Sequence, residues 1–281
     1  MRKINKDFTD IPESLKPTTT SFFPKGIYPE ESSATHSKRM SIINTSNYPS
    51  NNSATDKRYK TDDIIQKLND IYHKKCAFCE QRVEQTHVEH YRPKKGYIHK
   101  NGQQHNGYYW LSFSWDNLLI ACPNCNSKKG THFDILGTRA TFVNNEFNIT
   151  NINSLSSTYD LLELPLMINP EKEDPESHIS FDKSGNIFSV DRRYIYTIEK
   201  CNLKRNYLCD YRREILKDFE SKVRSRFVEY IDNKKRLYES IEELIRDFVS
   251  DANNLNKEYI SFRKYAIKNG WLNDIVKSLN K

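Results

Sequence analysis

The sequence predicts an α+β protein, in which a small metal-stabilised core is followed by a mostly α-helical C-terminal region. Two Cys-x-x-Cys pairs stand 42 residues apart in the first half of the chain, which is typical of a zinc-stabilised unit. From Arg192 almost to the end, apolar residues recur at helical spacing. Before that region, residues Ile179 to Val190 alternate apolar and polar side chains around Lys183 to Asn186, which predicts a β-hairpin.

Composition limits the class of protein. The 281 residues carry a formal charge of +7, which suits a polyanionic partner, although many basic proteins bind no nucleic acid. No apolar run approaches the roughly 18–20 residues that cross a bilayer, so we expect no membrane association. The first 17 residues lack the apolar stretch of a secretory signal, and we therefore expect a cytoplasmic protein. Cysteines in that compartment stay reduced and are free to bind metal.

We divide the chain into three parts. Residues 1–60 are rich in turn-forming residues and predict an N-terminal arm with one short helix near Ser32 to Asn44. Residues 61–150 form the predicted core with the zinc site, and residues 151–281 form the hairpin and helical C-terminal region. Two helical apolar stripes are predicted in this last part; their members are Ile215, Phe219, Val223 and Phe227, and then Ile241, Leu244, Ile245 and Phe248.

Within the core, Thr61 is a good N-cap for a helix that leads the chain into Cys76. Turn, strand and loop signals follow in order. They predict a zinc knuckle over Cys76–Val83, a strand over Val88–Tyr91 that ends at Arg92-Pro93, a loop over His99–Gly107, an aromatic segment over Tyr108–Trp115, a helical or turn segment after Asn117, and a helix from Asn126.

Four cysteines form the predicted zinc site: Cys76, Cys79, Cys122 and Cys125. Four thiolates complete a tetrahedral shell and leave no position for a reactive water, so this zinc should be structural. The other two cysteines, Cys201 and Cys209, lie eight residues apart in a helical segment and are predicted to be core thiols.

Three segments carry a resemblance to a known family: CAFCE at Cys76–Glu80, VEHYRPK at Val88–Lys94, and YYWLSFSWDNLLIACPNCNSKKGTHF at Tyr108–Phe133. They resemble the zinc-containing HNH endonucleases, and more narrowly the PtuB-like nucleases of Septu and some retron antiphage systems. A weaker match covers Glu163–Ile187. The resemblance implies a ββα-metal (HNH) nuclease core around the four-cysteine zinc knuckle.

Four residues receive roles in this comparison. His90 is predicted to be the general base, because a neutral imidazole accepts a proton from water near neutral pH. Glu89 stands where the family usually has Asp and is expected to bind a catalytic Mg²⁺ or Mn²⁺, although on a regular strand it would face away from His90. Asn117 is expected to orient the His90 ring. Asn126 replaces the last His of the motif and is expected to bind the same cation.

Flanking basic residues are predicted to contact phosphates, or to form an ordinary solvated face: Arg92, Lys94, Lys95, Lys128 and Lys129. The aromatic side chains between Tyr108 and Trp115 are expected to pack around the metal site rather than to stack on bases.

The predicted function is therefore a metal-dependent HNH endonuclease that hydrolyses phosphodiester bonds in nucleic acid, either DNA or tRNA. The resemblance implies an effector of antiphage defence with a PtuA-like ATPase partner and, in retron systems, a reverse transcriptase with its msDNA. The alternative is a zinc-stabilised nucleic-acid-binding or partner-docking subunit without its own catalysis.

Overall fold

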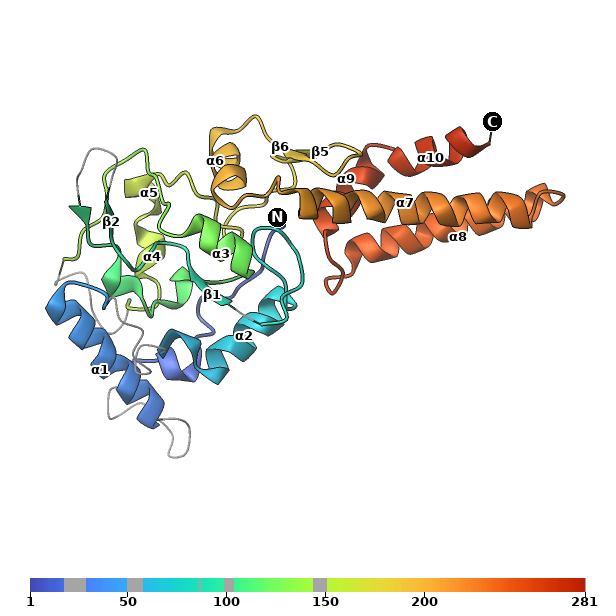
Figure 1. The fold of residues 1–281 in the computed structure, drawn as a ribbon. Helices are drawn as coiled ribbons and strands as arrows, with labels where there is room; N and C mark the ends of the chain where they lie inside the picture. The colour runs from blue at the N-terminus through green and yellow to red at the C-terminus, as the bar shows by residue number, and fades with distance from the viewer. Residues whose placement is uncertain (18–28, 50–57, 86, 99–103, 144–150, 281) are drawn as a thin grey trace.

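Helices make up most of the computed structural model, which describes residues 1–17, 29–49, 58–85, 87–98, 104–143 and 151–280. The strands within these ranges form small two-stranded sheets. Figure 1 shows a rounded body that contains the N-terminal and central elements, and a long pair of antiparallel helices that projects away from it. The structure therefore contains both helices and sheets, as the expected α+β class requires, and it is mostly helical with small sheets.

The described N-terminal residues pack against the body. Ile4 and Leu15 are buried, and Leu15 ends the short 3-10 helix η1 (Glu13–Leu15). The ammonium group of Lys6 donates hydrogen bonds to the backbone carbonyls of Trp115 and Leu118 at 2.8 and 2.7 Å. Helix α1 (Pro29–Thr45) follows, which confirms the predicted helix, and it contacts η1.

Helix α2 (Asp62–Tyr72) begins directly after Thr61, as predicted. Its apolar stripe buries Ile64, Leu68 and Tyr72 against the core, which anchors the helix. The helix ends at His73, whose positive φ of 53° turns the chain towards the first cysteine pair.

Two strands and one helix form the centre of the body. Strand β1 (His87–His90) pairs antiparallel with β4 (Leu118–Ala121), and helix α3 (Pro123–Lys129) packs on both strands. This confirms the predicted strand before Arg92.

The prediction of a helical or turn segment after Asn117 was wrong. Residues 118–121 form a strand because all four apolar side chains are buried, a pattern that periodicity does not separate from a helix. Helix α3 also starts earlier than Asn126. Pro123 suits its first position, and the Cys122 sulfur accepts a hydrogen bond from the Cys125 backbone N–H at 3.4 Å as an N-cap.

The connection between β1 and β4 carries further short elements: β2 (Tyr97–Ile98), β3 (Gln104–His105), η4 (Tyr109–Leu111) and η5 (Trp115–Asn117). The prediction of a loop over His99–Gly107 was wrong for Gln104 and His105, which form β3 and pair with β2. Residues 99–103 of this segment lie outside the described residues. Every side chain from Tyr108 to Trp115 is buried, so the aromatic residues pack in the core and are not exposed for stacking on bases.

The C-terminal part contains the predicted hairpin and helices. The turn between β5 and β6 includes Gly185 at φ +85°, a conformation that glycine adopts without strain. The elements are α4 (Leu155–Thr158), α5 (Asp160–Glu163), β5 (Ser180–Phe181), β6 (Ile187–Phe188), α6 (Arg192–Lys200), α7 (Asn206–Glu229), α8 (Lys234–Asn253), α9 (Ile260–Lys268) and α10 (Trp271–Leu279).

Helices α7 and α8 form the projecting pair. Their predicted stripes meet between them, where Phe219, Val223, Ile241 and Phe248 are buried. None of the helices in the described ranges has the length and apolar character that a membrane span requires.

Candidate metal and catalytic site

The four predicted zinc ligands come together in one buried cluster. The sulfurs of Cys76, Cys79, Cys122 and Cys125 all lie within 4.8 Å of one another. Tetrahedral zinc with Zn–S bonds of about 2.3 Å requires sulfurs about 3.8 Å apart. The Cys79 and Cys122 sulfurs are 3.8 Å apart, so the cluster has the size that a zinc ion needs.

The cluster lies where three local features meet. Cys76 and Cys79 stand in the turn after α2, Cys122 is the N-cap of α3, and Cys125 lies in its first turn. The backbone N–H of Ala77 donates to the Ile120 carbonyl at 2.9 Å, which holds the first pair beside strand β4. A bound zinc would therefore join α2, β4 and α3.

Arg205, the residue that precedes α7, lies against the cluster. Its guanidinium donates to the Cys125 sulfur at 3.5 Å and to the Cys122 sulfur at 3.7 Å. The neighbouring cysteines raise the pKa of Arg205, although burial opposes this. Four thiolates around Zn²⁺ leave two negative charges, and this guanidinium partly offsets them. Cys201 and Cys209 are buried but do not belong to the cluster, as predicted.

His90 is buried at the end of β1, 5 % exposed. Its Nε2 lies 2.9 Å from the backbone carbonyl of Ser112. A carbonyl only accepts hydrogen bonds, so Nε2 carries a proton and Nδ1 is the basic nitrogen of the neutral ring. Burial, and then the positive charge of Lys94, lower the pKa of His90 well below its ordinary value. The imidazole is therefore neutral at physiological pH.

Tyr59 lies over His90. It belongs to the 3-10 helix η3 (Arg58–Lys60), and its ring meets the imidazole edge-on with centroids 4.7 Å apart. The Lys94 ammonium lies 3.4 Å from the centre of the Tyr59 ring and 4.6 Å from that of Tyr48. The cation–π contact with Tyr59 holds η3 beside the imidazole, and Tyr48, which follows α1, binds the same cation.

Glu89 and His90 share one partner. The buried ammonium of Lys129 donates to Glu89 Oε1 at 2.6 Å and to the His90 backbone carbonyl at 2.7 Å. Lys129 thus fixes the carboxylate and the strand end that carries the imidazole. The hydrogen bonds recorded for Glu89 in the described residues engage only one of its carboxylate oxygens.

Asn117 has a different role from the predicted one. Its amide nitrogen donates to the backbone carbonyls of Arg92 and Leu111, and its oxygen accepts from the Arg92 N–H and the Ser156 hydroxyl. All the hydrogen-bonding capacity of this side chain is thus used away from the His90 ring. Asn117 instead clamps the chain after β1 against the start of β4, which positions His90 indirectly.

The predicted cation ligand Asn126 lies in α3, one turn before Lys129, and is half-buried. Apart from the cysteines, the described residues contain no group of three His, Cys, Asp or Glu side chains that could hold a metal. A catalytic cation would have to rely on Glu89, Asn126 and the oxygens of water and phosphate, which suits Mg²⁺.

The predicted phosphate contacts divide into two sets. Lys94 and Lys95 are half-buried and Lys128 is exposed, so all three reach the surface. The side chains of Arg92 and Lys129 are 0 % exposed and bound to carboxylates. The predicted role of these two as phosphate contacts is corrected, because neither presents its cation to the surface.

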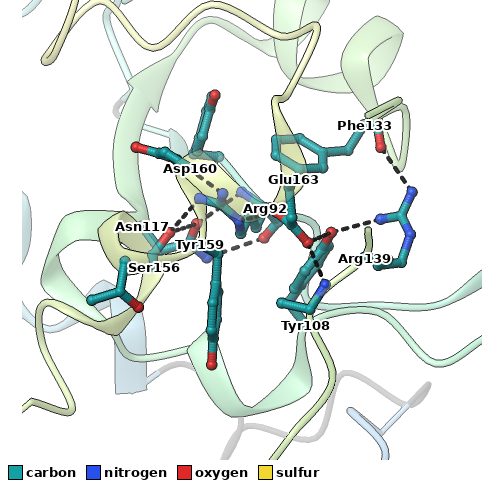
Figure 2. A network of polar contacts seen from close by, with 12 residues as sticks. Arg92, Tyr108, Asn117, Phe133, Arg139, Ser156, Tyr159, Asp160 and Glu163 are labelled. Atoms are coloured by element: carbon teal, nitrogen blue, oxygen red, sulfur yellow. Dashed lines mark hydrogen bonds and ion pairs between the residues drawn. The ribbon is translucent and has the colours of Figure 1, made fainter. Parts of the chain in front are cut away.

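Arg92 forms the centre of a buried polar network that Figure 2 shows. Its guanidinium donates to Glu163 at 2.8 Å, to Asp160 at 2.9 Å and to the Ser156 hydroxyl at 3.0 Å. Glu163 also accepts from the Tyr108 hydroxyl at 2.6 Å. The two carboxylates compensate the buried charge of Arg92, and together these contacts fasten α4 and α5 to the end of β1.

Sequence reasoning did not find this network. The segment from Glu163 resembled the same family as the core, but no role was assigned to it. In the structure, Glu163 of that segment is the buried acidic partner of Arg92. The joint resemblance of the two segments to one family was the only indication in the sequence that they belong together. Tyr59 and Arg205 carried no signal, because each reaches the site from a distant part of the chain.

The chain is similar to curated Septu proteins. It is 30% identical over 225 residues to the Septu protein PtuB of Bacillus mycoides (strain KBAB4), a match that covers 72% of each chain. A 69-residue stretch is 36% identical to the Septu protein PtuB of Bacillus thuringiensis, covering 23% of each. A 173-residue stretch is 26% identical to the Septu protein PtuA of Bacillus mycoides, covering 60% of this chain and 23% of that protein. No family model and no solved structure matches the chain.

Proposed function

Because this chain belongs to the PtuB family of Septu proteins, we propose that it is the nuclease subunit of an antiphage defence system and hydrolyses nucleic-acid phosphodiester bonds. The observation that carries the proposal is the packing of α3 on β1 and β4. The start of α3 contributes Cys122 and Cys125 to the cysteine cluster, and its last residue, Lys129, holds Glu89 and the His90 backbone. A ββα unit of this kind supports the proposed HNH core.

His90 is the proposed general base. Its tautomer is fixed by the Ser112 carbonyl, so Nδ1 is the nitrogen that takes a proton from the attacking water. Lys129 keeps Glu89 in place, and Asn117 fixes the backbone on the other side of the strand end. Catalysis of this type depends on such positioning of the base and of the carboxylate.

Two metals belong to the proposal. Zn²⁺ bound by the four cysteines would stabilise the fold and take no part in the reaction. A Mg²⁺ or Mn²⁺ held by Glu89 and Asn126 would neutralise charge on the scissile phosphate and its leaving oxygen. Lys94, Lys95 and Lys128 would hold the nucleic-acid backbone near the site.

The proposed partner is a PtuA-like ATPase, because the relatives are components of one named system. A host must keep such a nuclease silent until infection, so the partner would control access to the site. In a retron setting, the reverse transcriptase and its msDNA would join the complex.

One preparation tests the proposal. Zinc per chain is determined first, and the protein is then incubated with plasmid and with total tRNA in Mn²⁺ or in EDTA, beside His90→Ala and with and without the ATPase. Cutting that needs both Mn²⁺ and His90 supports the nuclease and identifies its substrate class.

Cutting at the wild-type rate by the His90→Ala protein contradicts the assignment of the base. Binding of nucleic acid without any cutting, even with the ATPase present, favours the non-catalytic subunit instead.

A further inference from the structure

Helix α1, at the edge of the rounded body in Figure 1, buries polar side chains on the face that packs against the rest of the chain. Ser32, Thr35, Arg39 and Ile42 follow one another at steps of three and four residues, and none of them is more than 2% exposed. Only Ile42 is apolar. A helix that serves packing alone presents apolar residues on its buried face, so this polar face indicates a further role.

Arg39 is a buried cation without an acidic partner. Its guanidinium donates to the backbone carbonyl of Phe113 at 3.0 Å, whereas its Nε has no hydrogen-bond partner. Among the described residues no carboxylate forms an ion pair with Arg39, and burial lowers its pKa to about 10, so it stays charged at neutral pH. The equally buried Arg92 is neutralised by Glu163 and Asp160. A buried charge without a counter-ion is unfavourable, and a bound anion would remove this penalty.

Two neighbours of Arg39 on α1 also lack partners. The hydroxyl of Thr35 and the Nδ1 atom of His36 are buried without a hydrogen bond. A helical threonine commonly donates to a carbonyl of the preceding turn, as Thr45 does to Ser41 at 3.1 Å, but Thr35 does not. Burial, and then the charge of Arg39, lower the pKa of His36, which indicates that the imidazole and the guanidinium are close.

We call Thr35, His36 and Arg39 the α1 donor set. Its members are three and four residues apart from Arg39 and therefore share one side of the helix. A hydroxyl, a neutral imidazole and a guanidinium can all donate hydrogen bonds, and only the guanidinium carries a charge. This combination suits an anion with several oxygen atoms.

The α1 donor set lies close to the proposed general base. Arg39 binds the carbonyl of Phe113, and Nε2 of His90 lies 2.9 Å from the carbonyl of the preceding residue, Ser112. The ring of Tyr59 lies 4.7 Å from that of His90 and 6.5 Å from that of Phe113. The basic Nδ1 of His90 points away from the Ser112 carbonyl, so an anion bound through Arg39 would lie beside the reacting phosphate and not replace it.

We propose that the α1 donor set binds a phosphate of the nucleic-acid backbone that neighbours the scissile phosphate. This inference rests on the proposed nuclease function. A phosphodiester supplies the negative charge that Arg39 lacks, and its two free oxygens can accept from the guanidinium and from the uncharged donors. His36 is half-buried, so the set reaches the surface at this side chain. Such a contact positions the strand without reading its bases.

Thermal unfolding of the full chain tests the anion site without any nuclease activity. It is measured in inorganic phosphate and in chloride at equal ionic strength, for the wild type, Arg39→Met and Thr35→Val. Arg246→Met, which removes an exposed cation of α8, is the control. We expect phosphate to raise the Tm of the wild type and of the control, because a ligand that binds the folded state stabilises it.

The two variants of α1 should behave differently from the control. Arg39→Met should lose the effect of phosphate and, in chloride, should unfold at the wild-type temperature or above it, because an unpartnered buried charge has been removed. Thr35→Val keeps the shape of the side chain and should lose part of the phosphate effect. This second variant keeps the test decisive if Arg39→Met does not fold.

Binding of nucleic acid tests the identity of the anion. Titrations with plasmid and with total tRNA at several salt concentrations are carried out in the His90→Ala background, where cutting does not interfere. Arg39→Met should raise the Kd by about tenfold, as for the loss of a hydrogen bond to a charged group. The slope of log K against log salt should fall by about one, the contribution of one phosphate. Arg246→Met should change neither.

The outcomes keep this inference distinct from the proposed function. A lower Tm of Arg39→Met in chloride, together with an unchanged phosphate effect in Thr35→Val, makes the set structural and overturns the inference. Loss of the phosphate effect with an unchanged Kd and salt slope for nucleic acid assigns the set to another anion, such as a carboxylate of a protein, and overturns it too. Both expected losses in a wild-type chain that never cuts support the phosphate site and overturn the nuclease alone.

Discussion

At the scale of single residues, His90 gives the sharpest prediction. His90→Ala should lower cleavage by about 10²–10⁴-fold, the usual contribution of a general base, and should leave zinc content unchanged. His87→Ala is the matched control, because His87 begins the same strand but is not part of the described contacts of the site. Equal losses in both variants would mean that the strand, not the imidazole, had been disturbed.

Arg205 should govern how firmly the cysteines hold zinc. Arg205→Met keeps an unbranched side chain but removes the guanidinium and its N–H donors, and partners of metal ligands typically contribute about 10–100-fold to affinity. We expect faster transfer of zinc to a chromogenic chelator. Arg205→Lys should retain part of the effect, because a charge remains near the sulfurs.

Arg92 is predicted to stabilise the fold and not to bind phosphate. Arg92→Met leaves Glu163 buried without its cation, and breaking such a pair costs about 3–5 kcal/mol. Denaturant unfolding should therefore show a large loss of stability. A normal stability together with a smaller salt dependence of nucleic-acid binding would instead restore the surface role.

At the scale of elements, η3 should control access to His90. Tyr59→Ala removes the ring that covers the imidazole and leaves Lys94 without this cation–π partner. We expect diethyl pyrocarbonate to modify His90 faster in this variant, as read by mass spectrometry of the peptide that contains it. Tyr211→Ala, on the projecting helices, should leave the rate unchanged.

The sequence predicted those elements whose own residues specify them. Helix α2 and the β5–β6 hairpin have a clear apolar period, and the cysteine spacing specifies the metal cluster. Strand β4 was missed because four consecutive apolar residues have no period.

Contacts between distant segments were not predictable in the same way. Lys129 was expected at the surface, and its burial depends on the position of Glu89 across the fold. The bond of Asn117 to the backbone of Arg92 likewise depends on the return of the chain from β1 to β4. Such partners follow from tertiary structure, and a single sequence does not contain a local signal for them.

At the scale of the whole molecule, the cysteine cluster should determine stability. It joins the end of α2, strand β4 and α3, and Arg205 connects it to the base of α7. Cys76→Ser should therefore lower the melting temperature and the zinc content together, since binding energy there is folding energy. Cys209→Ser, which lies outside the cluster, should retain full zinc.

The network around Arg92 has a consequence for the modularity of this protein. The predicted nuclease core covers residues 61–150, but Glu163 and Asp160, which lie beyond it, supply the charges that neutralise Arg92. A fragment cut at that boundary would carry an uncompensated guanidinium in its interior and could not keep its shape. The predicted nuclease core is therefore not an independent folding unit: its transfer to another protein would require at least α4 and α5 as well.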